Sequence, residues 1–524
     1  MKSRRNKFRN KIAKKILGRS FLITLFLLFQ FIILGVSFFL LTEYLHYILI
    51  INLILSFLLA VYIVNRQESP EFKIAWLTFM CLLPIFGILY YLYFELNPKW
   101  RTNAFKVQKL IKDTSYLLEV NKETQKGAEH DIPDRMGLLH FLQKKGSYPV
   151  YDETDVDYYN AGEKGFEAIK IALKNAKTYI FMEYFIVLPG KLLEELIEIL
   201  KERVEAGVEI RFMYDGFCHT KTLPYSFPER LRELGILVNV FEPLSPFLST
   251  DQNNRDHRKI TVVDGEVAFT GGFNLADEYV NYTHPFGHWK DVVVRVKGDA
   301  VKSFIVLFLQ NWHLKGDKPE DIWEDFIVDG ANRPKEQQNT SKKGYAVLYA
   351  DSPNIHNEIG ETVYLDILNQ AKNYVWIMSP YLVLGSVILK AVTYAAERGV
   401  DVKIIIPHIP DKKPPFLVAR SFYPELIHAG VKIYEYTPGF VHAKIFVSDD
   451  AVATVGSFNM DSRSFYLNYE VGLLLANCPA VKVISDDYEN TRQLCQKVKL
   501  QDYMSLPFSS RIIGKILRLF GPLL

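Results

Sequence analysis

A block of 19 residues occurs twice in this chain, and this repeat constrains the fold more than any other feature. The first copy reads DHRKITVVDGEVAFTGGFN over residues 256–274, and the second reads VHAKIFVSDDAVATVGSFN over residues 441–459. His, Lys, Asp, Gly and Asn recur at identical spacing, while many apolar positions differ. Packing depends mainly on the apolar positions, so matched polar positions indicate a duplicated unit with a shared chemical role.

The matched polar residues form equivalent pairs. These pairs are His257 with His442, Lys259 with Lys444, Asp264 with Asp449, Gly271 with Gly456, Gly272 with Ser457, and Asn274 with Asn459. A further acid follows each block, Asp291 in HWKDVVVRV and Glu470 in LNYEVGLLL. In both copies the His and the Lys are two residues apart on an expected strand, so their side chains share one face.

The segments that precede each block also repeat. AKTYIFMEYFIV, KLLEELIEILKERVEAG and VEIRFMYD correspond to AKNYVWIMSPYLVL, SVILKAVTYAAERG and VDVKIIIP. Each set predicts a strand, a helix that ends in Gly and another strand, which favours an α/β fold with a mostly parallel sheet covered by helices. We therefore expect two tandem α/β/α halves at 146–330 and 344–505, related by a pseudo-twofold axis and joined by a polar linker at 331–343.

The first 95 residues have a different character. Residues 1–19 hold nine Lys and Arg and no acid, and three charge-free apolar stretches follow at Ser20–Thr42, Tyr47–Val64 and Ile74–Phe94. Each is near the roughly 20 residues that a helix needs to cross a bilayer. A signal peptide is a weaker interpretation, because the first stretch is long and a second follows at once. The predicted order is a basic cytoplasmic arm at 1–19, a transmembrane segment of two or three helices at 20–95 and a juxtamembrane linker at 96–145.

The charges on either side of this segment bear on its topology. The basic arm and the Lys-rich stretch 96–113 both favour the cytoplasm, which three full spans would not allow. Pro84 and Gly87 lie within the third stretch and can break it into a re-entrant or interfacial element. We expect a multi-pass protein of the cell membrane with its main domain on the cytoplasmic face, and the number of spans stays open.

The remaining composition excludes several classes of protein. The net charge is +3, and residues 146–505 hold no broad basic face, which argues against a nucleic-acid partner. The four cysteines are scattered without CxxC spacing and are expected to be free thiols. No Cys, His or carboxylate cluster suggests a metal, and no cofactor is expected.

The C-terminal residues 506–524 include SSRIIGKILRLFGPLL, in which basic residues alternate with large apolar ones. This pattern predicts a basic amphipathic helix that lies on anionic lipid. The alternative is a terminal helix packed on the domain.

The duplicated polar residues suit phosphate chemistry if both halves contribute to one pocket. Lys and Asn side chains supply positive charge and donors for a phosphate diester, which gains negative charge during attack. One His can attack phosphorus as a neutral imidazole, and the other can protonate the leaving alkoxide. Asp291 and Glu470 are the candidates for orienting the two rings. Asp264 and Asp449 either take part in the chemistry or hold the turn that ends the strand, whereas His284 and His288 have no counterparts and are expected in a loop.

The two HxKxxxxD blocks, each followed by G[GS]xN, resemble the phospholipase D superfamily. The layout of nearly the whole chain, including AWLTFMCLLPIFGILYYLYF and GSFNMDSRSFYLNYE, is similar to bacterial cardiolipin synthases. The resemblance implies that two phosphatidylglycerol molecules are condensed into cardiolipin and glycerol through a phosphatidyl-histidine intermediate, without metal or nucleotide. It implies His257 as the nucleophile and His442 as the acid. The catalytic set that it implies is His257, Lys259, Asp264, His442, Lys444 and Asp449, with Asn274 and Asn459 binding the substrate phosphate.

Other functions remain open on the sequence. A hydrolase of the same superfamily would use water in place of an alcohol, and a related transferase would use another alcohol acceptor. The apolar N-terminal region argues against a nuclease. A membrane scaffold with a degenerate repeat is disfavoured, because both copies keep their His and Lys.

Overall fold

The computed structural model describes residues 44–66, 68–95, 98–243, 253–315, 323–327, 344–355 and 357–523, together with residues 28, 32 and 35. The chain divides into two compact units, Met1–Thr102 with Leu244–Asn253, and Asn103–Pro243 with Asn254–Leu524. Both halves of the repeat therefore lie in the same compact unit. The predicted arm at 1–19 and the predicted linker at 331–343 fall outside the described residues.

The first half is built on a seven-stranded sheet with the order β1-β9-β7-β6-β2-β3-β4. Its strands are β1 (Thr154–Tyr159), β2 (Tyr179–Tyr184), β3 (Glu209–Asp215), β4 (Leu237–Phe241), β6 (Lys259–Val263), β7 (Val267–Gly271) and β9 (Val293–Gly298). The second half repeats this order as β10-β19-β17-β16-β11-β13-β14, with β20 added at the edge. Its strands are β10 (Tyr345–Asp351), β11 (Tyr374–Met378), β13 (Asp401–Pro407), β14 (Lys432–Tyr436), β16 (Ile445–Ser448), β17 (Val452–Gly456), β19 (Asn468–Ala476) and β20 (Cys495–Lys497). The duplicated unit is thus confirmed.

The expectation of a mostly parallel sheet is wrong. Along the two strand orders given above, only β2, β3 and β4, and likewise β11, β13 and β14, run parallel to one another. The strands that carry the repeated block pair antiparallel with both neighbours. The reason is local, because the turn at residues 264–266 joins β6 directly to β7, and so short a connection links only antiparallel strands.

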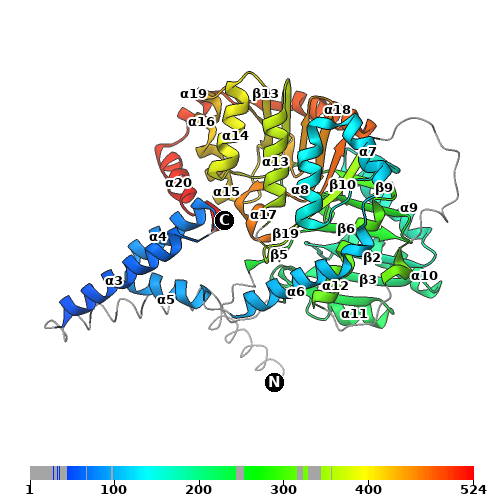
Figure 1. Cartoon of the computed structure of the whole chain (residues 1–524), viewed down its shortest axis with the longest axis horizontal. Coiled ribbons are helices and arrows are strands. Elements are labelled where there is room, and N and C mark those ends of the chain that lie inside the picture. The colour runs from blue at the N-terminus through cyan, green and yellow to red at the C-terminus, as the bar shows by residue number, and fades with distance from the viewer. Residues whose placement is uncertain are drawn as a thin grey trace. The chain divides into compact units, whose positions relative to one another are not determined.

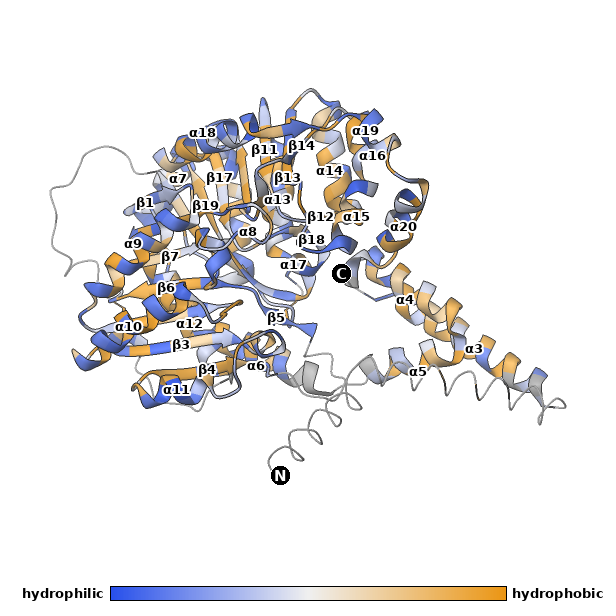
Figure 2. Ribbon diagram, turned by 180° about the vertical axis from the view of Figure 1, so that it is seen from behind, coloured by the Kyte–Doolittle hydropathy of each residue, from blue (hydrophilic) through white to orange (hydrophobic). Residues whose placement is uncertain are grey.

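Helices cover the outer face of each sheet, and two helices share the space between the sheets (Figure 1). The first outer face is covered by α9 (Gly162–Lys174), α10 (Lys191–Glu205) and α11 (Phe227–Glu233). The second is covered by α13 (Ile359–Gln370), α14 (Ser386–Glu397), α15 (Lys413–Ser421) and α16 (Tyr423–His428). The shared core holds α12 (Val301–Lys315) and α18 (Pro479–Gln493) between apolar strands, which are coloured as hydrophobic in Figure 2. One continuous core therefore ties the halves together.

The predicted juxtamembrane linker at 96–145 is mostly helical. It forms α6 (Pro98–Thr114), α7 (Lys122–Asp131) and α8 (Met136–Gly146). Leu138, Leu139 and Leu142 of α8 are buried in the core of the second half. The expectation of a linker is wrong for α8, because its apolar residues at helical spacing pack on the domain.

The N-terminal unit contains α3 (Leu45–Val64), α4 (Pro70–Leu82) and α5 (Pro84–Glu95). The third apolar stretch of the sequence is broken between α4 and α5, where Pro84 begins a new helix. Gly87 lets α5 approach α4 closely, since a Cβ there would lie 2.8 Å from Met80 Cα. Within the described residues, no helix combines the length and apolarity that crossing a membrane requires. The predicted stretch Ser20–Thr42 lies almost entirely outside the described residues.

Candidate active site

Two short parallel strand pairings join the halves and set the geometry of the site. In one pairing β5 (Arg255–Asp256) lies against the start of β19, and in the other β8 (His288–Lys290) lies against β15 (Gly439–Val441). Asp256 is opposite Tyr469, and Val441 is opposite Lys290. The two pairings have equivalent registers, so the next residue of each strand faces the other half. His257 thereby meets Glu470, and His442 meets Asp291.

Each histidine is hydrogen-bonded to the carboxylate of the opposite half. His257 Nδ1 lies 2.9 Å from both carboxylate oxygens of Glu470. His442 Nδ1 lies 2.7 Å from Asp291 Oδ2. A carboxylate on Nδ1 holds the proton there and leaves Nε2 for the substrate. The structure therefore brings together the two histidines and the two acids that the sequence singled out, in reciprocal pairs.

Both lysines lie beside the histidine of their own half. Lys259 Nζ donates to the carbonyl oxygen of His257, and Lys444 Nζ donates to the carbonyl oxygen of His442 at 2.5 Å. Lys444 Nζ also lies 2.9 Å from His442 Nδ1. His442 Nδ1 can either donate a proton to Asp291 or accept one from Lys444. We assign it the donor role toward Asp291, because the carboxylate is a charged acceptor. The histidines and lysines are all buried, so the site concentrates positive charge away from water.

Burial and neighbouring cations keep the histidines neutral in the empty site. Burial lowers the pKa of His257 well below its usual range, and the charges of Lys259 and Lys444 lower it further. Burial and Lys444 lower the pKa of His442 to about 3, against the opposing effect of Asp291. Burial also lowers the pKa of Lys259 to about 8 and that of Lys444 to about 7. An anionic phosphate diester would reverse these shifts, because it favours every protonated neighbour.

The two carboxylates differ in charge. The pKa of Asp291 is lowered in spite of burial, because His442 donates a hydrogen bond to the carboxylate and the charge of Lys444 favours its ionised form. Burial raises the pKa of Glu470 to about 7, although Lys259, Ser457 and Asn468 oppose the rise. Near neutral pH, Asp291 is therefore ionised, while Glu470 is partly protonated.

Gly272 and Ser457 occupy equivalent positions in the two blocks, and each contacts the carboxylate of its own half. A Cβ at Gly272 would lie 2.1 Å from Asp291 Oδ1, so only glycine leaves room for that carboxylate. Ser457, at the equivalent position, donates its hydroxyl proton to Glu470. The sequence matched these two positions without giving them a role.

The two predicted phosphate-binding asparagines are both buried, but their surroundings differ. Asn274 Oδ1 accepts a bond from Ile186 N at 3.0 Å, and its amide nitrogen donates to Tyr279 Oη at 3.0 Å. Asn459 Oδ1 has no hydrogen-bond partner in the described structure. An unpaired amide oxygen can accept a bond from a substrate hydroxyl but not from a phosphate oxygen, and phosphate binding by either asparagine stays a prediction.

Asp264 and Asp449, for which the sequence left a catalytic role and a turn-holding role open, are placed by the structure at the turns that end their strands. Each lies at the far end of its strand from the histidine and has a positive φ, 53° and 55°. Asp264 accepts bonds from the backbone N–H groups of residues 177, 178 and 179 at 2.7 to 3.0 Å. Asp449 accepts equivalent bonds from residues 372, 373 and 374 at 2.7 to 2.8 Å. Both residues hold the turn to the start of a neighbouring strand, and neither contacts a histidine or lysine of the site.

Aromatic side chains complete the site, and sequence reasoning missed them. The ring of Phe185 lies 4.9 Å from that of His257, and the rings of Trp289 and Tyr279 lie 5.2 and 5.3 Å from that of His442. Trp289 stands in the quoted HWKD segment, which was the available signal. His288 was expected in a loop, but it is the first residue of β8. Its Nδ1 is hydrogen-bonded to Tyr436 Oη at 2.9 Å.

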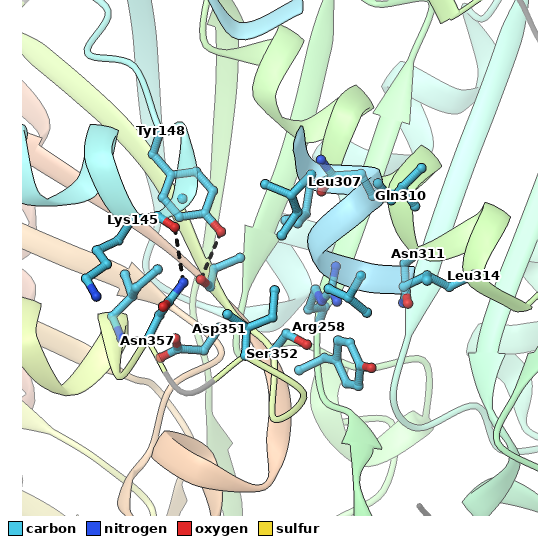
Figure 3. A pocket seen from close by; sticks show the side chains of 18 residues that line it. Lys145, Tyr148, Arg258, Leu307, Gln310, Asn311, Leu314, Asp351, Ser352 and Asn357 are labelled. Atoms are coloured by element: carbon cyan, nitrogen blue, oxygen red, sulfur yellow. Dashed lines mark hydrogen bonds between the residues drawn. The ribbon is translucent and has the colours of Figure 1, made fainter. Parts of the chain in front are cut away.

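A separate pocket has Arg258, the residue that follows His257, in its wall (Figure 3). Tyr469, the residue that precedes Glu470, also contributes to this wall. Adjacent side chains of an extended chain point to opposite faces. Arg258 is buried and lies 3.6 Å from Glu183 and 3.7 Å from Asp256. The guanidinium and its two acids form a polar layer under the site, and the second half has Ala443 at the position equivalent to Arg258.

The cysteines and possible metal ligands add nothing to this site. Cys81, Cys218, Cys478 and Cys495 are free. Among the residues that the structure describes, no group of three or more His, Cys, Asp or Glu could hold a metal ion.

Comparison with known proteins agrees with this architecture. Residues 169–310 and 364–492 match the family described as "Cardiolipin synthase, PLD-like domain", and residues 54–95 match "Phospholipase_D-nuclease N-terminal". A cardiolipin synthase of Geobacillus thermodenitrificans is 35% identical over 466 residues, which cover 88% of this chain and 90% of that protein. An uncharacterized protein of Streptococcus mutans is 40% identical over 88% of this chain and 99% of that protein.

A solved structure supports the fold. Phosphatidylserine synthase from Haemophilus influenzae aligns with a TM-score of 0.53 at 14% identity, covering 74% of this chain and 100% of that chain. Two matched halves, reciprocal His–carboxylate pairs and close relatives over most of the length agree. The chain belongs to the cardiolipin synthase family of proteins with phospholipase D-like domains.

Proposed function

We propose that this protein condenses two phosphatidylglycerol molecules into cardiolipin and glycerol. The observation that carries the proposal is the reciprocal pairing of His257 with Glu470 and of His442 with Asp291. It supplies two oriented imidazoles beside two buried lysines, which suits a two-step displacement at a phosphate diester. Relatives named cardiolipin synthase support cardiolipin as the product at the level of the family.

In the first step His257 Nε2 attacks the phosphorus of one phosphatidylglycerol. The bond from phosphorus to the glycerol oxygen breaks, and His442 gives its Nε2 proton to that oxygen, so glycerol leaves. His442 must be protonated at this point, and ionised Asp291 together with the anionic substrate favours that form. Lys259 and Lys444 offset the charge that develops on the phosphate oxygens.

The second step reverses these roles. The terminal hydroxyl of a second phosphatidylglycerol gives its proton to neutral His442 and attacks phosphorus. The bond from phosphorus to His257 Nε2 breaks, which releases cardiolipin and restores both side chains. Water in place of this hydroxyl would yield phosphatidic acid, and another alcohol would yield a different diester.

We further propose that residues 20–95 attach the protein to the cell membrane, with the catalytic unit on the cytoplasmic face. The three charge-free stretches and the basic residues on both sides of them support this attachment. A single cysteine introduced at 330–342 should resist a membrane-impermeant thiol reagent in intact cells. Labelling of that cysteine without permeabilisation would contradict the cytoplasmic placement.

The activity can be tested with the full-length protein in phosphatidylglycerol vesicles. We expect cardiolipin and glycerol in equal amounts, with phosphatidic acid a minor product. Phosphatidic acid alone would identify a hydrolase, and turnover only with an added alcohol would identify another transferase. The variants His257→Ala and His442→Ala serve as inactive controls, and His284→Ala is a matched control because His284 lies exposed outside the site.

A further inference from the structure

The C-terminal helix α20 (Phe508–Arg518) has one packed face and one open face. Its packed face contains Gly514, where a Cβ would lie 2.6 Å from Leu417 O, so glycine allows α20 to lie directly on α15. Arg518 adds an ion pair with Glu425 at 3.2 Å, and its guanidinium lies over the ring of Phe422. The alternative of a terminal helix packed on the domain is therefore correct for this face.

The open face is unusually apolar. Its large exposed side chains are Phe508, Ile512, Ile513, Ile516 and Leu519. Phe508 is 70% exposed and Ile516 is 52% exposed, and both lie on one stripe at helical spacing. Soluble proteins rarely leave such a contiguous stripe in water. Something covers this face when the protein is in its working environment.

Charge indicates what covers it. Lys515 is exposed within the apolar stripe, and its long side chain can carry the ammonium group past neighbouring apolar atoms to a polar boundary. From Phe508 to Leu524 the tail holds Arg511, Lys515 and Arg518 and no acid. An apolar face that contains the exposed Lys515, in a tail without acids, complements an anionic lipid surface, where the ring and aliphatic groups enter the acyl boundary.

The helix that α20 packs on leads to the catalytic site. α15 begins at Lys413, directly after the loop 408–412, which we call the mouth loop. Tyr381 donates a bond to Asp411 of this loop at 2.6 Å, and Lys412 lies over the ring of Tyr381. The charge of Lys412 is among the causes that lower the pKa of His257, after burial, Lys259 and Lys444. The charge of Asp411 acts on Tyr279, whose ring contacts His442. The contacts with Tyr381 fix the mouth loop, and its charges act on His257 and on Tyr279, the neighbour of His442.

We propose that α20 and α15 form a lipid-docking element that holds the mouth of the catalytic site against an anionic leaflet. The open face of α20 inserts at the acyl boundary, and exposed Lys412 and Lys413 face the lipid phosphates at the mouth. This inference deepens the proposed function, because it names the surface through which a lipid substrate reaches the histidines. The docking itself does not depend on which lipid product forms.

The docking can be measured apart from activity. In a cysteine-free background, the full chain is labelled with an environment-sensitive fluorophore at Ile512→Cys or Ile516→Cys and placed in nanodiscs. We expect a blue shift, and quenching by spin-labelled lipid, in nanodiscs that contain phosphatidylglycerol. The matched control is Ile171→Cys on α9, since Ile171 is 62% exposed and lies far along the chain in the first half. Equal, unquenched emission from positions 512 and 171 would overturn the proposal. A blue shift that appears in detergent and grows with protein concentration would assign the face to a second copy and would also overturn it.

Activity provides the second measurement. The double variant Ile512→Ser/Ile516→Ser should lose turnover at least fivefold on phosphatidylglycerol in nanodiscs, and retain it on a short-chain, water-soluble phosphatidylglycerol. In the same nanodiscs, Lys412→Gln/Lys413→Gln should lower the ratio of docked to undocked α20, reported by the fluorophore at position 512, about fivefold for each charge. Equal losses on both substrates would place these residues in folding or chemistry and contradict docking. If neither substrate is turned over by the unmodified protein, the proposed function fails while the fluorescence result still decides the docking.

Discussion

The two halves of this protein share one strand order and one polar block, yet they supply different carboxylates to the site. The first half gives Asp291, which has Gly272 beside it and stays ionised next to His442. The second half gives Glu470, which accepts a bond from Ser457 and has a pKa raised to about 7 next to His257. An ionised partner favours an imidazole that holds a proton, and a partly neutral one favours an imidazole that stays unprotonated. The comparison indicates that duplication built the site and that unequal acids divided its labour.

Removing either histidine should cause the largest loss. We expect His257→Ala and His442→Ala each to reduce cardiolipin formation by at least about 10³-fold, since each removes a group that acts in both steps. A phosphatidyl ester of p-nitrophenol separates the two roles, because its leaving group needs no acid. His442→Ala should release p-nitrophenol in a single burst with this substrate, and His257→Ala should release none. A burst from His257→Ala instead would reverse the assignment.

The carboxylates provide a smaller but sharper test of the same comparison. Asp291→Asn should reduce kcat by about 10² to 10⁴, because it removes the negative charge that stabilises protonated His442. Glu470→Gln should cost less, since its carboxyl group is already partly neutral near pH 7. Steady-state rates of both variants against phosphatidylglycerol measure the difference. Equal losses would contradict the division of labour.

The pH dependence of kcat/KM should reflect the unequal acids. As pH rises through about 7, Glu470 loses its proton and becomes the anionic partner of His257, so the rate rises. Lys444 loses its proton and its charge from about pH 7 and Lys259 from about pH 8, so the rise is limited to a narrow optimum and the rate then falls. These groups interact, so each limb belongs to the set of coupled groups. Glu470→Gln should abolish the rising limb, whereas Asp291→Asn should keep it.

The turn-holding aspartates should have the smallest effect on chemistry and equal effects in both halves. Asp264→Asn and Asp449→Asn keep a residue that tolerates positive φ but weaken the bonds to backbone amides. We expect each to lower the free energy of unfolding by about 1 to 2 kcal/mol and to leave kcat within twofold. Thermal unfolding in detergent and the vesicle assay measure the two quantities. A loss of kcat comparable with that of Asp291→Asn would restore these residues to the catalytic set.

Much of the site could be predicted because its residues recur at fixed spacing. The histidines, lysines and asparagines were found by the 19-residue repeat, and Asp291 and Glu470 by their place after each copy. The role of Asp264 and Asp449 could not be read from spacing, since it depends on which strand start lies beside the turn. The prediction of a mostly parallel sheet was wrong because it rested on the alternation of strands and helices. The short turn within each block joins two antiparallel strands.

The sequence by itself determined the duplicated unit and the chemical groups of the site, because these follow from local spacing. The expected strand is interrupted at the histidines, since His257 lies between β5 and β6 and His442 lies between β15 and β16. The tertiary structure alone decided that each histidine takes its carboxylate from the other half. His257 and Glu470 are 213 residues apart, and His442 and Asp291 are 151 apart. No local pattern encodes such a pairing. It arises because one shared core fixes the halves against each other and two short strand pairings set their register.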